Sequence, residues 1–113
     1  LGRRRYIPEF NNPNMAIRQF AERQAVNAPI QGTAADLIKR SMVDVTRAMT
    51  RAGFQSRLIL QVHDELIFEV KKSEKKELGA CVRAGMEKAI RLDVPLKTTL
   101  FYGKNWLETE EIA

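Results

Sequence analysis

The acidic pair Asp64 and Glu65 follows His63 at a point where two stretches of alternating apolar residues meet. Two strands joined by so short a link form an antiparallel hairpin, so the pair is predicted to lie at its tip. A tight hairpin normally has Asn-Gly or Asp-Gly there, because those residues accept a positive φ. Carboxylate oxygens are hard ligands suited to Mg²⁺, and a rigid tip would hold them where a phosphate could share the ion. The alternative is that both acids are solvated turn residues.

The stretches on either side of His63 have the two-residue period of strands. The alternating apolar positions are Leu58, Leu60 and Val62 before the tip, and Leu66, Phe68 and Val70 after it. Each set is predicted to point to one face of its strand. The number of residues in the turn itself is left open.

Two helices are predicted upstream of the hairpin. In the first, Ile17, Phe20 and Ala21 mark one apolar face. It is predicted to end near Asn27, because Pro29 has no N–H with which to continue the hydrogen bonding.

The second upstream helix is predicted to begin at Thr33, because Asp36 three residues later completes the spacing of a capping box. Its apolar face comprises Ile38, Met42, Val45 and Met49, and its polar face Arg40, Asp44, Arg47 and Arg51. Gly53 supplies the left-handed residue that commonly ends a helix.

A third helix and a last strand are predicted downstream of the hairpin. Ser73 and Glu74 open the helix, and residues 93–95, Asp-Val-Pro, stop it. Its apolar positions are Leu78, Val82, Met86, Ala89 and Ile90. The strand runs from Leu96 to about Tyr102. Three helices, a hairpin and a short C-terminal strand predict an α+β fold without internal repeats.

The composition is that of an ordinary globular protein, with 44% hydrophobic and 29% charged residues among 113. No apolar stretch approaches the roughly 20 residues of a membrane span, and no signal peptide is visible, so the expected location is cytoplasmic, without membrane contact. Cys81, the one cysteine, cannot form an internal disulfide. A net charge of +5 favours a polyanionic partner. Residue 1 is leucine, which predicts a chain that begins inside a longer protein.

Two long motifs give the chain a family resemblance. Residues 61–66, Gln-Val-His-Asp-Glu-Leu, resemble the motif C hairpin of family A DNA polymerases of the bacterial DNA polymerase I type. Residues 27–36, Asn-Ala-Pro-Ile-Gln-Gly-Thr-Ala-Ala-Asp, resemble the segment that precedes motif C in that family. The opening residues 2–6 and the ending residues 94–96 also fit, in the right order. The resemblance implies a palm-type hairpin within a larger polymerase domain.

The resemblance implies a role for each residue of the tip. Asp64 is expected to be a direct metal ligand that helps two Mg²⁺ ions clamp the attacking primer hydroxyl and the departing pyrophosphate oxygens. Glu65 is a secondary acidic group at the catalytic centre. His63 is a DNA-binding residue that contacts the primer strand near its 3′ end.

The resemblance also places Arg23, Asn27 and Gln31, spaced every four residues, against the primer-template duplex. In the minor groove every base pair presents purine N3 and pyrimidine O2 acceptors, so such donors can test pair geometry without reading sequence. The alternative for Asn27 and Gln31 is to satisfy backbone groups at a helix end or turn. The basic run of residues 3–5 could bind backbone phosphates or be merely solvated.

The implied site is incomplete within this chain. A two-metal site needs a second aspartate, which the family supplies from motif A, and neither that motif nor the fingers-helix motif for the dNTP phosphates occurs here. Residues 1–113 are therefore interpreted as the C-terminal portion of a polymerase domain, inactive in isolation. The resemblance implies a full-length parent that acts in DNA replication and repair, with primer-template DNA, dNTP and the remaining polymerase domain as the expected partners.

Two other functions remain open from sequence. The chain could be a non-catalytic nucleic-acid binding module that keeps a duplex surface without the rest of an enzyme. It could also be an unrelated metal-dependent nuclease, if other carboxylates converge on Asp64.

Overall fold

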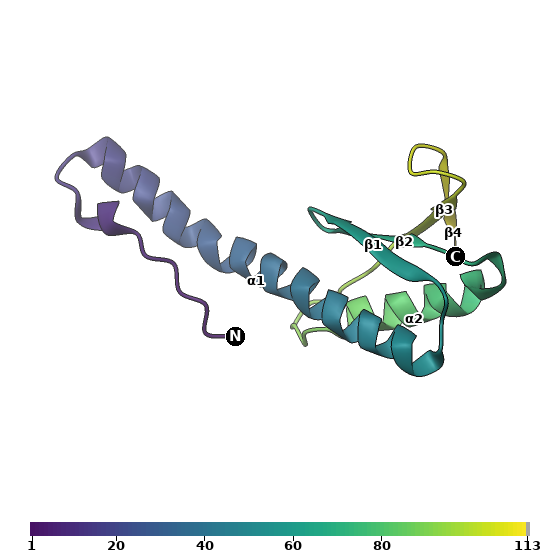
Figure 1. Ribbon diagram of the computed structural model, residues 1–113. Coiled ribbons are helices and arrows are strands. Elements are labelled where there is room, and N and C mark those ends of the chain that lie inside the picture. The colour runs from purple at the N-terminus through teal and green to yellow at the C-terminus, as the bar shows by residue number, and fades with distance from the viewer. Residues whose placement is uncertain (113) are drawn as a thin grey trace. The chain divides into compact units, whose positions relative to one another are not determined.

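The computed structural model describes residues 1–112 (Figure 1). The chain divides into two compact units, residues 1–36 and the residues from Leu37 onward. Helices and two small antiparallel sheets make up the described chain, so the predicted α+β class is confirmed. Within residues 1–112 no helix combines the length and the apolar character needed to cross a lipid bilayer.

A single helix, α1 (Met15–Ala52), takes the place of the two helices predicted upstream of the hairpin. Pro29 lies inside it, so the predicted break was wrong. A break would leave about four carbonyls and four N–H groups in need of caps, whereas the proline withholds one donor from the carbonyl of Ala25. The Thr33 hydroxyl donates to the Pro29 carbonyl across 2.6 Å, so Thr33 is a helix-interior residue and not a cap.

The ends of α1 follow directly from the residues found there. The side-chain oxygen of Asn14 accepts a hydrogen bond from the backbone N–H of Ala16 at 3.0 Å, which caps the first turn. At the other end Gly53 has a φ of 71°, as predicted for the terminating residue. The N–H of Phe54 then donates to the Met49 carbonyl at 3.1 Å, the bond typical of a Schellman cap. Before α1, residues 1–14 contain one short 3₁₀ helix, η1 (Pro8–Asn11).

The predicted antiparallel hairpin is present as β1 (Arg57–Val62) and β2 (Glu65–Glu69). Its register shifts partway along, because Leu58 lies opposite Phe68 whereas Leu60 lies opposite Ile67. The extra residue on β1 is Ile59, a β-bulge, and it places Leu58 and Leu60 on opposite faces. The prediction that the three apolar residues of β1 share one face was therefore wrong.

The core of the second unit forms where α2 (Lys75–Glu87) packs against the C-terminal half of α1. Its buried residues are Val45, Met49, Leu78 and Val82, with Phe54, Phe68, Val70, Cys81, Met86 and Leu100 packed around them. Val45 is fully buried. An apolar side chain of this size contributes roughly 1.5 to 3 kcal/mol when buried, so these contacts anchor the hairpin to the helices.

The third predicted helix is shorter than the sequence indicated. α2 ends at Glu87, so Ala89 and Ile90 lie beyond it, and the prediction that it runs to residues 93–95 was wrong. The N–H of Lys88 still reaches the Ala84 carbonyl at 3.2 Å and closes the last turn. The Glu87 carboxylate then accepts the backbone N–H of Thr98 at 2.9 Å, which ties the following segment back to the helix end.

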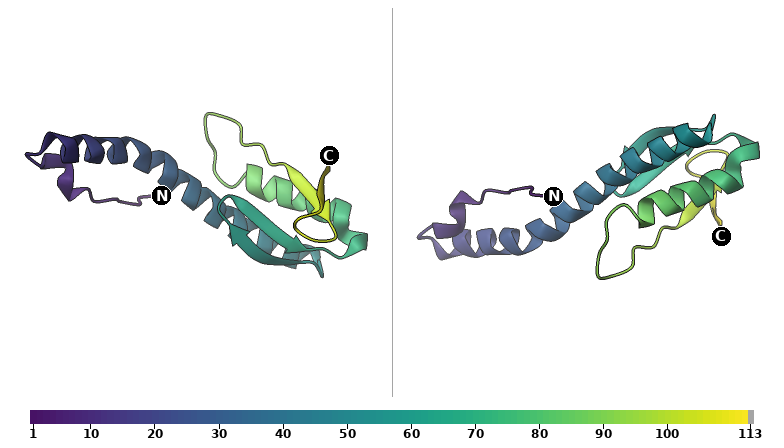
Figure 2. Two further views of the ribbon diagram at one scale, coloured as in Figure 1. Left: turned by 90° about the horizontal axis from the view of Figure 1, so that it is seen from above. Right: turned by 90° about the horizontal axis from the view of Figure 1, so that it is seen from below.

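The last part of the described chain is a second hairpin, β3 (Leu100–Gly103) paired with β4 (Thr109–Ile112). The predicted C-terminal strand is thus confirmed in its second half, although it begins at residue 100, and its partner β4 was not predicted. Both views of Figure 2 show this hairpin beside α2. The contact is close at Gly79, where an added Cβ would lie 3.3 Å from a Leu100 methyl carbon.

Candidate functional site

The turn between β1 and β2 contains two residues, His63 and Asp64, since Val62 and Glu65 form the last pair of the ladder. His63 has a φ of 51°, while Asp64 stays at negative φ. A positive φ at the first central position alone is what type II′ hairpin turns have, usually with glycine there. The left-handed position therefore belongs to the histidine. Both Asp64 and Glu65 are left exposed.

The backbone of the turn is held by a side chain from β1. The Gln61 side-chain amide donates to the His63 carbonyl across 2.6 Å. A left-handed conformation costs a residue with a Cβ about 1 to 2 kcal/mol. The hydrogen bond helps to offset that cost and fixes the peptide that precedes Asp64. Sequence reasoning missed this contact, although a long polar side chain two residues before a turn is a usable signal.

The chemistry of the tip is that of a partial metal shell. Asp64 and Glu65 offer adjacent, exposed carboxylates on a hydrogen-bonded ladder, and such hard oxygen donors fit Mg²⁺. Within residues 1–112 no group of three or more His, Cys, Asp or Glu side chains is arranged to hold a metal ion. Asp64 and Glu65 alone are thus fewer than the ligands that a metal ion usually takes from a protein.

In the first unit the structure brings Arg23, Asn27 and Gln31 together on one face of α1. All three are exposed, and the four-residue spacing turns successive side chains by only about 40°. The helix continues through Asn27 and Gln31, which removes the alternative that they satisfy a helix end or turn. Their donors point to solvent along a row about 12 Å long.

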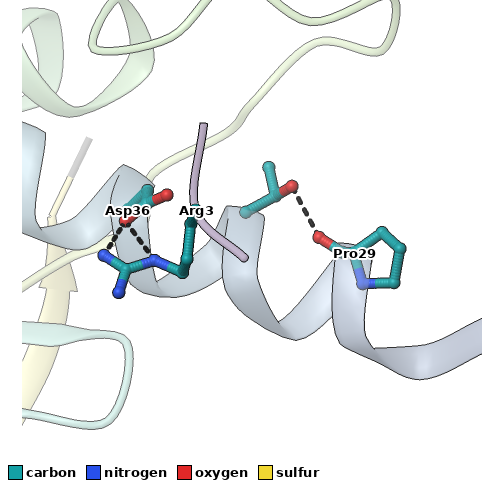
Figure 3. Close-up of polar contacts among 4 residues, drawn as sticks. Arg3, Pro29 and Asp36 are labelled. Carbon is teal, nitrogen blue, oxygen red and sulfur yellow. Dashed lines mark hydrogen bonds and ion pairs between the residues drawn. The ribbon is translucent and has the colours of Figure 1, made fainter. Parts of the chain in front are cut away.

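The basic run of residues 3–5 is divided between two environments. The Arg3 guanidinium forms an ion pair with Asp36, with its Nε donating to the carboxylate at 3.0 Å (Figure 3). This hydrogen bond, with the attraction between the charges, raises the pKa of Arg3. Arg4 and Arg5 are exposed. Asp36 therefore ties the N-terminal segment to α1 and does not form the predicted capping box with Thr33.

A polar network secures the base of the hairpin. The Glu74 carboxylate accepts hydrogen bonds from the Ser56 hydroxyl at 2.7 Å and from the backbone N–H groups of Gln55 and Ser56 at 3.1 and 3.0 Å. The Ser56 oxygen in turn accepts the backbone N–H of Lys71 at 3.0 Å. The entry of β1 and the exit of β2 are thereby tied to the start of α2. The sequence had indicated only that Glu74 opens a helix.

Replacing Glu74 with glutamine is expected to lower the melting temperature at pH 7. The Ser56 hydroxyl and the Gln55 N–H hold the pKa of Glu74 below its usual value of 4.5. Because the pKa of Glu74 is lower in the folded state than in the unfolded state, its ionised carboxylate stabilises the fold at pH values above about 4.5. This stabilisation is lost as the pH falls through the folded-state pKa. The difference in melting temperature between wild type and Glu74→Gln should therefore shrink below pH 4.5. A difference that stayed constant from pH 7 to pH 3 would contradict the network.

Comparison with known proteins extends over nearly the whole chain. The sequence model of DNA polymerase family A matches residues 1–108. DNA polymerase I of Mycobacterium bovis is 51% identical over 106 residues, which are 94% of this chain and 12% of that protein. DNA polymerase I of Bacillus subtilis is 50% identical over 108 residues, with 96% and 12% covered. The chain thus spans about an eighth of the length of these relatives.

A solved structure has the same fold over most of the chain. It is the POL domain of Pol1 from M. smegmatis in complex with DNA primer-template and dNTP. The match has a TM-score of 0.81 and 55% sequence identity, and it covers 85% of this chain and 17% of that one. The similarity therefore concerns one part of a larger domain.

Proposed function

The chain belongs to DNA polymerase family A, and from this premise we propose that it forms one side of the active site of a DNA-directed DNA polymerase. The reaction is addition of deoxynucleotides to a primer 3′ end by two-metal phosphoryl transfer. Residues 1–113 are the C-terminal, palm-containing portion of the polymerase domain. The observation that carries the proposal is the exposed Asp64, on a two-residue turn inside the matched region.

Asp64 acts in this proposal as the metal ligand that the chain contributes. The bound Mg²⁺ ions would activate the primer hydroxyl and neutralise charge on the leaving pyrophosphate. The Asp64 carboxylate holds its position because the turn is closed by the β1–β2 ladder and by the Gln61 side chain. Glu65, the first residue of β2, adds a second acidic group. A motif A aspartate elsewhere in the parent protein completes the shell.

His63 is proposed to contact the primer strand near its 3′ end. It precedes Asp64 directly, so a strand whose terminal hydroxyl approaches the metal also passes the histidine. His63 lies in the turn, outside the β1–β2 ladder, and its side chain is exposed. Such a contact positions the primer and needs no proton transfer.

The row of Arg23, Asn27 and Gln31 is proposed to lie in the minor groove of the primer-template duplex. All three side chains carry N–H donors, and acceptors are present in that groove in every base pair. An enzyme that copies any template sequence needs contacts of this kind, which do not depend on the identity of the bases. The complex of the M. smegmatis relative with primer-template and dNTP supports both partners.

Changing Gln31 to alanine in the full-length protein is expected to weaken primer-template binding, or discrimination against a mismatched primer end, roughly two- to tenfold. That range corresponds to the loss of one neutral hydrogen bond. Binding is measured by fluorescence anisotropy, and discrimination by extension of matched and mismatched primers.

The control for Gln31→Ala is Thr33→Ala, which also truncates an exposed, uncharged side chain of α1. Two positions along a helix turn the side chain by about 200°, so Thr33 lies on nearly the opposite side from Gln31. Its variant should keep both the affinity and the discrimination of wild type. Unchanged affinity and error rate in Gln31→Ala would argue against the groove contact.

The chain is proposed to act only together with the remaining polymerase domain, and to be inactive alone. No observation favours the binding module or the metal-dependent nuclease over this proposal. Primer extension by the full-length protein carrying a change at Asp64 tests its catalytic part.

A further inference from the structure

A pocket of about 340 Å³ lies between α2 and the β3–β4 hairpin, which Figure 2 shows side by side. Its basic lining residues are Lys75, Lys76 and Arg83, and its apolar wall includes Leu100 and Ile112. The volume is at the lower end of the range for small-molecule sites. None of these residues has a role in the proposed polymerase chemistry.

The shape of the pocket follows from the order of residues along α2. Lys76 and Arg83 are seven positions apart, so they extend from the same face of the helix two turns apart, about 10 Å along its axis. Between them on that face lie Gly79 and Ala80, which have almost no side chain. The hollow between the two cations therefore exists because small residues form its floor.

Among the residues that the structure describes, no counter-charge lies in the pocket. No Asp or Glu lines it, and within residues 1–112 none of the three basic side chains forms an ion pair. The Nε of Arg83 is shielded from solvent and has no hydrogen-bond partner in that part of the chain. Lys75 lies over the ring of Tyr102, 3.9 Å from its centre, which orients the ammonium group but brings no net negative charge.

We propose that this pocket binds a small phosphate-type oxyanion, such as inorganic phosphate or pyrophosphate. Lys75 and Arg83 are half-buried, and partly desolvated cations that lack a counter-charge are costly. An oxyanion supplies that charge together with several acceptors, and the exposed Lys76 can reach it from the rim. The planar guanidinium of Arg83 suits two oxygens of one phosphate group, and the lysines suit the remaining oxygens as flexible point charges. The β3–β4 hairpin closes one side and limits the size of the ligand.

The proposal is tested by chemical footprinting on the full-length protein. Lysine acetylation by a small acylating reagent is followed residue by residue by mass spectrometry, in phosphate and in chloride at equal ionic strength and pH. Phosphate is expected to slow acetylation of Lys75 and Lys76 at least threefold, and to leave Lys72, which lies outside the pocket, unchanged. The proposal would be overturned if Lys75 and Lys76 were each acetylated as fast in phosphate as in chloride.

Two variants separate a specific site from general screening of charge. Arg83→Gln replaces the guanidinium with a shorter, neutral polar side chain, and it should raise the phosphate concentration for half-protection at least about tenfold, as expected for one lost charge-assisted hydrogen bond. Lys72→Gln removes the same charge outside the pocket and should leave that concentration unchanged. Equal shifts in both variants would overturn the site. If Arg83→Gln unfolds, Lys76→Gln is used, with protection of Lys75 as the readout.

A third comparison distinguishes the source of the phosphate group. Pyrophosphate and a short single-stranded oligonucleotide are titrated in the same assay. Protection by inorganic phosphate and pyrophosphate at lower concentration than by phosphodiester groups supports a pocket for a free oxyanion. Protection by the oligonucleotide alone would overturn that ligand class and assign the surface to nucleic acid.

Discussion

Changing Asp64 to asparagine is expected to reduce nucleotide incorporation by the full-length protein at least about 100-fold. Partners that merely orient a metal ligand are typically worth 10- to 100-fold, so a direct ligand should reach the upper end of that range or beyond. Asparagine is a suitable variant because it has the shape of aspartate and tolerates turn conformations, but lacks the anionic oxygen. The loss can then be assigned to chemistry and not to the fold.

The measurement is single-turnover incorporation of one dNTP at saturating Mg²⁺, with primer-template affinity determined separately. Affinity should remain close to that of wild type. The matched control is Glu69→Gln, which removes an exposed carboxylate from the other end of β2 and should retain near-normal incorporation. Near-normal incorporation by Asp64→Asn with normal DNA binding would show that Asp64 is not a metal ligand.

Changing Gly85 to alanine is expected to destabilise the fold by about 1 to 2 kcal/mol. A Cβ at residue 85 would lie 2.5 Å from a methyl carbon of Val45, which is fully buried and cannot turn away. Overpacking of this kind costs about 1 to 3 kcal/mol, and the better helix propensity of alanine returns at most about 1 kcal/mol. The steric cost therefore prevails, and the urea midpoint of the purified protein should fall.

Gly79→Ala is the matched control, because it makes the same chemical change on the same helix. Its new Cβ would meet only the far end of the Leu100 side chain, at 3.3 Å. Its stability should stay near that of wild type or rise slightly. Adding Val45→Ala to Gly85→Ala should restore part of the lost stability, since the smaller residue makes room for the Cβ. Equal stability of the two glycine variants would disprove the close packing of α2 on Val45.

The hairpin and its acidic tip were predictable because they depend on local pattern. A two-residue period on either side of a very short link leaves only one strand arrangement, and the residues near the link must lie near its tip. The bulge at Ile59 was not predictable, because residues 58–60 are all apolar and alternation cannot show which of them is extra. The register determines which residues form the turn. Because the bulge could not be predicted, the positive φ of His63 could not be predicted either.

The remaining differences come from interactions between residues distant in sequence. Asp36 has the spacing of a helix-capping residue, but its partner is Arg3, 33 positions earlier. Glu74 has the local signature of a helix start, but its carboxylate bonds to Ser56, 18 positions earlier. β4 was missed because three of its four residues are polar, so only pairing with β3 identifies it as a strand. Proline removes only one backbone hydrogen bond from a helix. In α1 the backbone hydrogen bonds on either side of Pro29 are enough to keep the helix continuous.

The bulge at Ile59 also has a consequence for how the length of β1 is counted. If Ile59 were paired in the ladder instead of bulged, regular pairing from the base of the hairpin would place Gln61 opposite Glu65 and leave three residues, Val62, His63 and Asp64, in the turn. Leaving Ile59 unpaired in the bulge shifts the pairing by one position and yields the two-residue turn that is observed. The conformation at the tip therefore depends on a bulge four positions upstream, and a β1 strand shortened by that one residue would pair regularly up to the same two-residue turn.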